Sequence, residues 1–228
     1  MKLELIEKKE ELKGVISFVF KPLEAATWKA GQYAHYVLHH EPTDDRGSDR
    51  WFTIAAAPFE ENFVITTRID DTTKSTFKKK LESLQIGKKI EVGAIEGDFV
   101  LEDYSKEYVF IAGGIGITPF YSILKQLDHE NVKAKITLLY ANRDENVPFK
   151  EEFEKIARNN PELKIHYIIA PERLDETKIQ SLVGDITKPI FYVSGPEPMV
   201  ESLGNKLKEV GVSADHLKQD WFPGYPAE

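Results

Sequence analysis

Residues 107–121 read Glu-Tyr-Val-Phe-Ile-Ala-Gly-Gly-Ile-Gly-Ile-Thr-Pro-Phe-Tyr, and this stretch decides the fold of the second half of the chain. The apolar run Tyr108–Ala112 is typical of a short strand that is buried on both faces. Three glycines follow at once. Thr118 then suits the N-cap of a helix, and Pro119 suits its first turn. The stretch therefore predicts a strand, a glycine-rich turn and a helix that begins near Thr118.

Gly113, Gly114 and Gly116 leave the backbone of this turn accessible. Without side chains in the way, backbone N–H groups and a helix N-terminus can face an anion, for which phosphate or pyrophosphate is the natural choice. A glycine turn is a weak signal by itself, and the spacing departs from the G-x-G-x-x-G fingerprint. A tight turn that binds nothing is the alternative. The buried strand before it and the helix after it favour a ligand, whose identity stays open.

The pattern on either side of residue 103 predicts two domains. Later residues alternate between strands and helices, as in a parallel α/β sheet. We expect strands at 108–112, 135–140, 164–169 and 190–193, and helices at 119–127, 150–158, 177–182 and 197–210. The first hundred residues hold short strands separated by turn signals, which is typical of a small antiparallel barrel. We expect these strands at 3–6, 15–20, 32–38, 52–56, 63–68 and 89–92, with one helix at 75–84.

Length, composition and net charge limit the classes of protein to which this chain can belong. The chain has 228 residues, 41% of them hydrophobic, which suffices for two modest domains with cores of their own. No apolar run approaches the roughly 20 residues of a membrane helix, and the N-terminus lacks a signal-peptide core. We therefore expect a soluble, cytoplasmic protein without a membrane span. A net charge of −8 argues against nucleic-acid binding.

Two residue types exclude further classes of site. The chain has no cysteine, which excludes disulfides, thiolate-bound zinc and an iron–sulfur cluster held by this chain. None of the six histidines forms a ligand pair at metal-binding spacing. We therefore expect no intrinsic metal.

Arg50-Trp51-Phe52-Thr53 is the first of two further motifs. Alternate residues of a strand share a face, so Arg50 and Phe52 should point one way and Trp51 and Thr53 the other. An Arg can hold a phosphate, an aromatic ring can stack on a flat ring, and a hydroxyl can reach a ring heteroatom. An edge-strand Arg followed by core residues is the alternative.

The second motif, Ser194-Gly195-Pro196-Glu197-Pro198-Met199, again lies between an expected strand and an expected helix. The carboxyl ends of parallel strands share one edge of a sheet, where ligands bind. We therefore expect Gly113–Pro119 and Ser194–Met199 to line the same cleft.

Together, R-x-F-T, G-G-I-G-I-T-P and S-G-P-x-x-M resemble the motifs of the ferredoxin–NADP reductase family, in the same order. Trp28–Tyr33 resembles that family's W-x-x-G-Q-Y segment, so the resemblance covers nearly the whole chain. It implies an FAD-binding β-barrel domain (residues 1–103) and an NAD(P)-binding α/β domain (residues 104–228), without an iron–sulfur domain. It also implies an NAD(P)H-dependent flavin reductase that holds FAD, or less commonly FMN. Its electrons would pass to a separate partner such as a ferredoxin, a flavodoxin or an oxygenase component.

The resemblance also implies roles in the barrel. Arg50 would hold flavin phosphate, Phe52 would pack on the flavin with Trp51 as a further contact, and Thr53 would lie near flavin N5. Phe52 stands where the family usually has Tyr, so a stacking face is kept and a phenolic hydrogen bond is lost. A second phosphate-contacting segment would comprise Thr67, Arg68, Lys74, Ser75 and Thr76.

For the nucleotide, the resemblance implies a pyrophosphate loop of Gly113, Gly114, Gly116, Thr118 and Pro119. A second loop, comprising Ser194, Gly195, Pro196 and Met199, would lie beside the nicotinamide, with Ser194 in place of the usual Cys at the reacting carbon. Arg143 would contact the adenosine ribose and could meet a 2′-phosphate, which leaves NADPH and NADH both open. Phe222 or Tyr225 would cover the flavin, or pack as an aromatic tail.

Two other classes of protein also fit the sequence. A non-catalytic flavin- or nucleotide-binding regulatory or electron-transfer subunit would bind the cofactor without being reduced. An α/β dehydrogenase with an accessory barrel would bind no flavin and would need an acid–base group, for which the motif loops offer no histidine.

Overall fold

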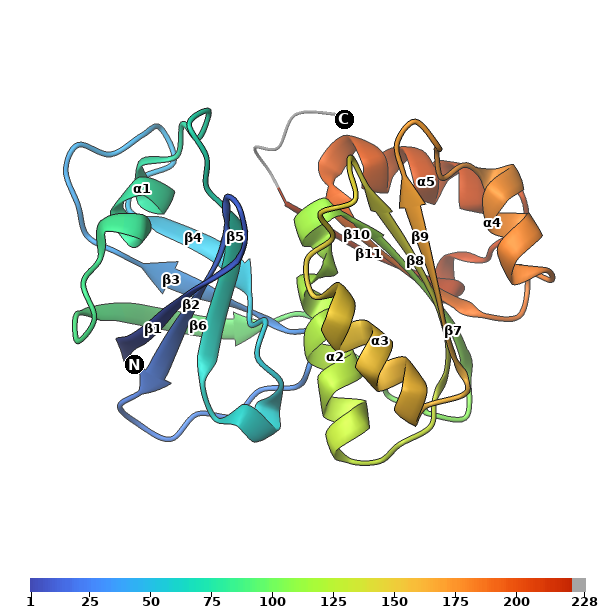
Figure 1. The fold of residues 1–228 in the computed structure, drawn as a ribbon, viewed down its shortest axis with the longest axis horizontal. Helices are drawn as coiled ribbons and strands as arrows, with labels where there is room; N and C mark the ends of the chain where they lie inside the picture. The colour runs from blue at the N-terminus through green and yellow to red at the C-terminus, as the bar shows by residue number, and fades with distance from the viewer. Residues whose placement is uncertain (223–228) are drawn as a thin grey trace. The chain divides into compact units, whose positions relative to one another are not determined.

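The computed structural model describes residues 1–222, which fall into two compact units (Figure 1). Unit 1 comprises residues 1–100 and the short segment Tyr121–Gln126. Unit 2 comprises Leu101–Phe120 and the chain from Leu127 onward.

Unit 1 is a curled antiparallel sheet of six strands in the order β4-β3-β6-β1-β2-β5. Every neighbouring pair is antiparallel. The strands are β1 (Lys2–Leu12), β2 (Val15–Pro22), β3 (Tyr33–Val37), β4 (Asp49–Thr53), β5 (Phe63–Arg68) and β6 (Lys89–Glu96). A half-barrel results, with β4 and β5 at its edges, so the predicted antiparallel barrel fold is confirmed.

Alternate side chains of the strands form the core of unit 1, because successive residues point to opposite faces. Leu3 and Leu5 on β1 and Phe18 and Phe20 on β2 are fully buried. The predicted helix is present as α1 (Thr76–Ser83) and contributes Phe77 to the same core. A short 3-10 turn, η1 (Pro58–Glu60), connects β4 to β5.

The strand expected at 52–56 lies earlier, at Asp49–Thr53. Residues 54–57 are apolar and buried, but they lie outside the strand and do not continue its hydrogen-bond ladder. The carbonyl of Ala56 accepts hydrogen bonds from Trp28 Nε1 at 3.3 Å and from Ser122 Oγ at 2.7 Å. An apolar run thus marks burial, and burial here does not require a strand.

Unit 2 is a parallel sheet of five strands in the order β11-β10-β7-β8-β9, which confirms the predicted α/β class. The strands are β7 (Glu107–Gly113), β8 (Lys135–Asn142), β9 (Leu163–Ile169), β10 (Ile190–Pro196) and β11 (Leu217–Phe222). The helices are α2 (Thr118–His129), α3 (Lys150–Asn159), α4 (Glu176–Val183) and α5 (Glu197–Glu209), with the 3-10 turns η2 (Gly114–Ile117) and η3 (Ala214–His216).

Helices cover both faces of this sheet (Figure 1). On one face, Phe110 of β7 stacks on Phe120 of α2 with ring centroids 4.6 Å apart. On the other, Val109 and Ile111 join a cluster with residues of α4 and α5, including Ile179. Because β7 is buried on both faces, its sequence is an unbroken apolar run, as expected for a central parallel strand.

Strand β11 was not predicted. It pairs only with β10, so it is an edge strand, and its residues Leu217–Asp220 are mostly polar and half-buried. Its sequence therefore carries no apolar run to mark it.

Within residues 1–222, none of the helices combines the length and the apolar character that a membrane crossing requires.

Candidate functional site

The barrel motif starts from strand β4, where Arg50 and Phe52 lie on the same face. The Arg50 guanidinium carbon is 5.7 Å from the centre of the Phe77 ring, and the Phe52 ring is also 5.7 Å from it. Both side chains therefore contact Phe77, as the alternation of the strand predicts. Arg50 is 4% exposed, whereas Phe52 keeps part of its surface accessible.

Trp51 lies on the opposite face of β4 and is 45% exposed. Its ring packs on His35 at 4.8 Å and against the edge of Tyr33 at 5.3 Å. His35 Nε2 in turn lies 2.6 Å from Asp49 Oδ2. The structure thus separates Trp51 from Arg50 and Phe52 and places it in a surface cluster.

Thr53 ends β4 with a hydroxyl that is buried and has no hydrogen-bond partner within residues 1–222. A buried hydroxyl without a partner costs about 1–3 kcal/mol. Such a group fits a hydrogen bond to a polar ligand atom, which is the role that the motif predicts for Thr53.

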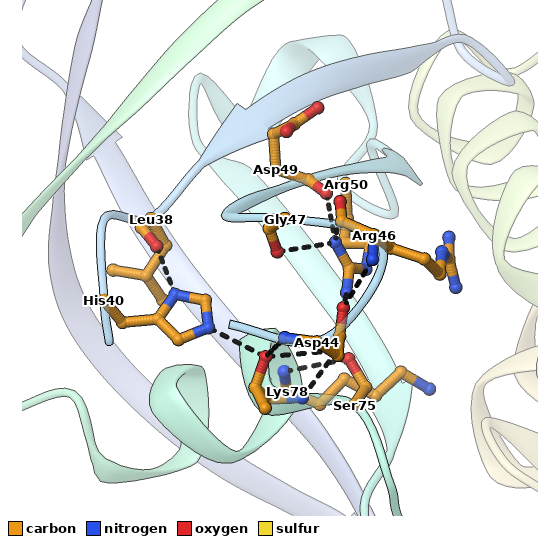
Figure 2. A network of polar contacts seen from close by, with 10 residues as sticks. Leu38, His40, Asp44, Arg46, Gly47, Asp49, Arg50, Ser75 and Lys78 are labelled. Carbon is orange, nitrogen blue, oxygen red and sulfur yellow. Dashed lines mark hydrogen bonds and ion pairs between the residues drawn. The ribbon is translucent and has the colours of Figure 1, made fainter. Parts of the chain in front are cut away.

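The Arg50 guanidinium is held by the loop that precedes β4 (Figure 2). Nη1 donates to the carbonyl oxygens of residues 46, 47 and 49 at 2.9, 3.0 and 2.6 Å. Nη2 donates to Asp44 Oδ1 at 2.5 Å. Arg50 is therefore fixed in place, and its buried Nε–H has no acceptor within residues 1–222.

The Asp44 carboxylate also reaches the start of α1. Its Oδ2 accepts from the Thr76 backbone N–H at 2.8 Å and from the Thr76 hydroxyl at 3.1 Å, and its Oδ1 accepts from the Arg46 N–H at 3.0 Å. Partial burial acts to raise the pKa of Asp44, but the hydrogen bonds from Thr76, Arg50 and Arg46 outweigh it and lower the pKa to about 2. Asp44 is therefore ionised at neutral pH and joins Arg50 to Thr76.

The residues of the predicted second phosphate segment differ in position. Thr67 is buried in β5, while Arg68 and Lys74 are exposed. Ser75 is the N-cap of α1, and its hydroxyl accepts from the Lys78 N–H at 3.4 Å. Of this segment, Thr76 is the residue that the structure brings to Arg50, through Asp44.

In unit 2, the glycine-rich stretch forms the end of β7, the turn η2 and the start of α2. Gly114 has a φ of +50°, and a Cβ at this position would meet no atom within 4 Å, so this side of the turn is open. Thr118 is already helical, and its hydroxyl donates to the Ile115 carbonyl at 3.3 Å. The predicted N-cap role of Thr118 is therefore wrong, because η2 leads directly into α2 without the extended residue that an N-cap requires.

The two predicted loops of unit 2 pack against each other at backbone distance. A Cβ on Gly116 would lie 2.6 Å from Gly195 Cα, and closer still to the Ser194 carbonyl oxygen. A Cβ on Gly113 would collide with the Met199 sulfur. Gly113–Pro119 and Ser194–Met199 therefore lie together, and glycine at position 116 is what permits the approach. That the two loops line one ligand cleft stays a prediction.

These loops leave the sheet at its topological switch point. Strands β7 and β10 are neighbours, but β7 connects through α2 to β8 on one side, while β10 connects through α5 to β11 on the other. Connections that leave two adjacent parallel strands in opposite directions open a crevice at their carboxyl ends, where ligands of α/β sheets bind. Ser194 lies at this point, fully buried, and its hydroxyl has no hydrogen-bond partner within residues 1–222.

The remaining predicted residues of unit 2 differ in exposure, and one of them lies outside the described residues. Pro119 is buried in the first turn of α2, and Pro196 precedes the first residue of α5. Arg143 is exposed just past the end of β8. The backbone of Phe222 ends β11, and Tyr225 lies outside the described residues.

Asp44 was not singled out from the sequence. It lies in a polar loop among exposed residues, and nothing in that loop sets it apart from its neighbour Asp45. The signal that exists is its place six residues before Arg50, and such a spacing across a loop does not predict contact.

Residues 110–204 match the family described as "Oxidoreductase NAD-binding domain". A flavohemoprotein from Rhodopirellula baltica is 26% identical over 95% of this chain, which covers 59% of that protein. The ferredoxin reductase component of 3-ketosteroid-9-alpha-monooxygenase from Mycolicibacterium smegmatis is 26% identical over 97% of this chain, which covers 65% of that protein. The chain thus spans about three fifths of the length of these relatives.

The fold is also that of a solved structure, the flavohem-like FAD/NAD-binding domain of nitric oxide dioxygenase from Vibrio cholerae. The TM-score is 0.83 at 22% identity, over 97% of this chain and 98% of that one. The fold of the whole chain, the matched NAD-binding segment and the order of the motifs agree. This chain therefore has the fold of FAD/NAD-binding domains of this kind, and its residues 110–204 match the oxidoreductase NAD-binding domain.

Proposed function

We propose that this oxidoreductase of FAD and NAD(P)H transfers hydride from the nicotinamide to bound FAD and passes electrons on to a separate acceptor protein. The observation that carries the proposal is the pair of loops at the switch point of the parallel sheet. Gly116 and Ser194 bring these loops to backbone contact and leave one buried hydroxyl, Ser194 Oγ, without a partner within residues 1–222.

The nucleotide fits the chemistry of these loops. The backbone N–H groups of η2 and the start of α2 suit a pyrophosphate, and the open side of Gly114 leaves space for it. The Ser194 hydroxyl would orient the nicotinamide ring by a hydrogen bond. Arg143, at the end of β8, would contact the adenosine ribose in either NADPH or NADH. We propose residues 104–228 as the NAD(P)-binding domain.

The flavin fits the chemistry of the barrel. Arg50 Nε and Thr53 Oγ1 are both buried without a partner in the described chain, and each can bond a polar atom of a ligand. Phe52 offers a partly exposed ring for stacking. We propose residues 1–103 as the FAD-binding domain, with Arg50 at the phosphate, Thr53 at the flavin ring and Thr76 at a phosphate oxygen.

The acceptor is proposed from chemistry and from the relatives. Flavin can take two electrons as hydride and release them one at a time, which suits transfer to a one-electron carrier. This chain has no cysteine to hold an iron–sulfur cluster. The relative from M. smegmatis is a ferredoxin reductase component of a monooxygenase. We therefore propose a ferredoxin, a flavodoxin or an oxygenase component as the partner.

The visible spectrum of the purified protein tests this function. We expect flavin bands, present as purified or after FAD is added, that bleach without oxygen when NADH or NADPH is supplied. The faster of the two reductants identifies the coenzyme. Arg50→Ala and Thr53→Ala should lower flavin content and the rate of bleaching, respectively. Bands that persist with both coenzymes would instead support a regulatory subunit, and a protein that binds neither FAD nor FMN would refute the proposal.

A further inference from the structure

The Asp44 carboxylate occupies a position built for an anion (Figure 2). Its donors are the buried Arg50 guanidinium, 6 residues away in sequence, and the backbone N–H and hydroxyl of Thr76 at the start of α1, 32 residues away. A guanidinium with a helix-start amide is a donor set that binds phosphate. The carboxylate is therefore a resident anion where a phosphate group fits.

The Asp44 carboxylate bonds only one of the two neighbouring N–H groups that Arg50 can offer to an anion. Nε–H and Nη2 lie side by side on a guanidinium and together form a fork for two oxygens of one anion. Asp44 takes Nη2 at 2.5 Å, while Nε, buried in a side chain that is 4% exposed, has no partner within residues 1–222. A phosphate that replaced Asp44 would have oxygens for both arms of the fork.

The loop that carries Asp44 is held to α1 by hydrogen bonds to a single residue, Thr76. The Asp44 N–H donates to Thr76 Oγ1 at 3.0 Å, and His40 Nε2 lies 3.0 Å from the same hydroxyl. That hydroxyl has one hydrogen and lies within hydrogen-bond distance of both Asp44 Oδ2 and His40 Nε2. Residues 41–46 are exposed apart from Asp44. Opening of this loop is therefore opposed mainly by hydrogen bonds, those of Asp44 and those of Arg50 to the carbonyls of residues 46 and 47, and by little buried side-chain surface, which favours local opening.

We propose that Asp44 is an internal competitor of the flavin phosphate, and that it sets how tightly and how fast the chain takes up flavin. Asp44 leaves Arg50 and Thr76 before the phosphate binds, and loop 40–48 opens as it leaves. The inference rests on the proposed function, because it takes Arg50 as the residue that holds flavin phosphate. When the closed loop predominates, the apparent Kd for flavin equals the Kd of the open protein divided by the fraction of the protein that is open.

A supporting role for Asp44 predicts the opposite change in flavin affinity. If Asp44 served to orient Arg50 toward the ligand, its removal would weaken flavin binding. Asp44→Asn keeps the shape of the side chain and removes its charge. Asp45→Asn removes the same charge from the exposed neighbouring residue and serves as the matched control.

The experiment measures FAD binding to flavin-free wild type, Asp44→Asn and Asp45→Asn by quenching of flavin fluorescence, at equilibrium and by stopped flow. We expect the Kd of Asp44→Asn to be at least tenfold lower than that of wild type, a change of about 1.4 kcal/mol. The association rate of wild type should level off at high FAD concentration, where loop opening limits it, and this limit should rise in Asp44→Asn. Inorganic pyrophosphate should compete with FAD, and more strongly in Asp44→Asn. Asp45→Asn should behave like wild type.

A Kd of Asp44→Asn equal to or above that of wild type would overturn the inference and leave the proposed function intact. An equal gain in Asp45→Asn would also overturn it, since the effect would then come from net charge alone. If none of the three proteins binds FAD or FMN, the proposed function fails and the inference fails with it. Thermal unfolding of each variant establishes that it is folded before its Kd is compared.

Discussion

Replacing Gly116 by alanine should destabilise unit 2 by steric overlap alone. Gly116 has an ordinary backbone conformation, so alanine carries no conformational penalty there. Its Cβ would nevertheless lie 2.6 Å from Gly195 Cα and from the Ser194 carbonyl carbon. These are backbone atoms of β10, a central strand of the parallel sheet, and they cannot rotate away as a side chain would.

The size of the effect follows from that overlap. Inserting a methyl group into a packed region costs about 1–3 kcal/mol, and the rigid neighbours place Gly116→Ala near the upper end. Gly→Ala also restricts the unfolded chain, which returns roughly 0.4–1 kcal/mol. The net loss is about 2 kcal/mol. At roughly 2–4 °C per kcal/mol for a chain of this size, the Tm should fall by about 4–8 °C.

Gly114→Ala is the matched control, two residues away in the same turn. Its φ of +50° costs alanine about 1 kcal/mol, but a Cβ there meets no atom within 4 Å. The restriction of the unfolded chain offsets much of this cost, so the Tm should change by no more than about 2 °C. Because that Cβ projects into the open side of the turn, Gly114→Ala should instead raise the KM for NAD(P)H.

Differential scanning calorimetry without nucleotide measures both changes, and steady-state reduction of flavin measures the KM values. A Gly116→Ala protein whose Tm lies within 1 °C of wild type would refute the reasoning. Equal destabilisation by Gly114→Ala would refute it as well, because backbone strain rather than overlap would then be the cause.

Three further predictions concern single side chains. Asp44 has a pKa lowered to about 2, so its contribution to stability is fully present above about pH 4 and is lost as the pH falls from about 4 to about 2. The difference in Tm between wild type and Asp44→Asn should therefore shrink over that range, and a constant difference would contradict this. Ser194→Ala removes a buried hydroxyl without a partner in the described chain, so the free energy of unfolding should stay equal or rise by up to about 1 kcal/mol, while the rate of flavin reduction by NAD(P)H falls. Ser194→Cys should restore part of that rate. A destabilised alanine variant would contradict the assignment. Asp175 caps α4 by accepting from the Lys178 N–H at 2.8 Å, so Asp175→Ala should lower the free energy of unfolding by about 1 kcal/mol in a denaturant titration without affecting flavin reduction.

The motifs predicted the strand–turn–helix order of the second domain because each motif depends on local backbone chemistry. The strand ending at Gly113 is marked by an apolar run, and the turn after it by glycines, so strand, turn and helix could be read from residues 107–121 directly. The prediction that Thr118 is the N-cap of α2 was wrong, also for a local reason. A 3-10 turn and an extended cap fit the same residue types, and the sequence alone does not choose between them.

Partners across the sheet were less accessible to prediction. That Ser194 and Gly116 meet follows from β10 lying beside β7, although 77 residues or more separate them along the chain. The general rule for parallel sheets anticipated that their loops would meet at one edge. It did not give the backbone contact that makes glycine necessary at position 116, nor the edge strand β11, whose polar residues resemble a loop.

The sequence by itself determined the two fold classes, the position of most helices and strands, and the motif residues Arg50, Gly113 and Ser194, because periodicity, glycine turns and short motifs are properties of neighbouring residues. Only the tertiary structure decided which charge pairs with which. The Asp44 carboxylate reaches Arg50 across a loop and Thr76 across 32 residues of chain. Such a contact depends on where β4 and α1 are placed in three dimensions, and no local pattern in the sequence encodes that placement.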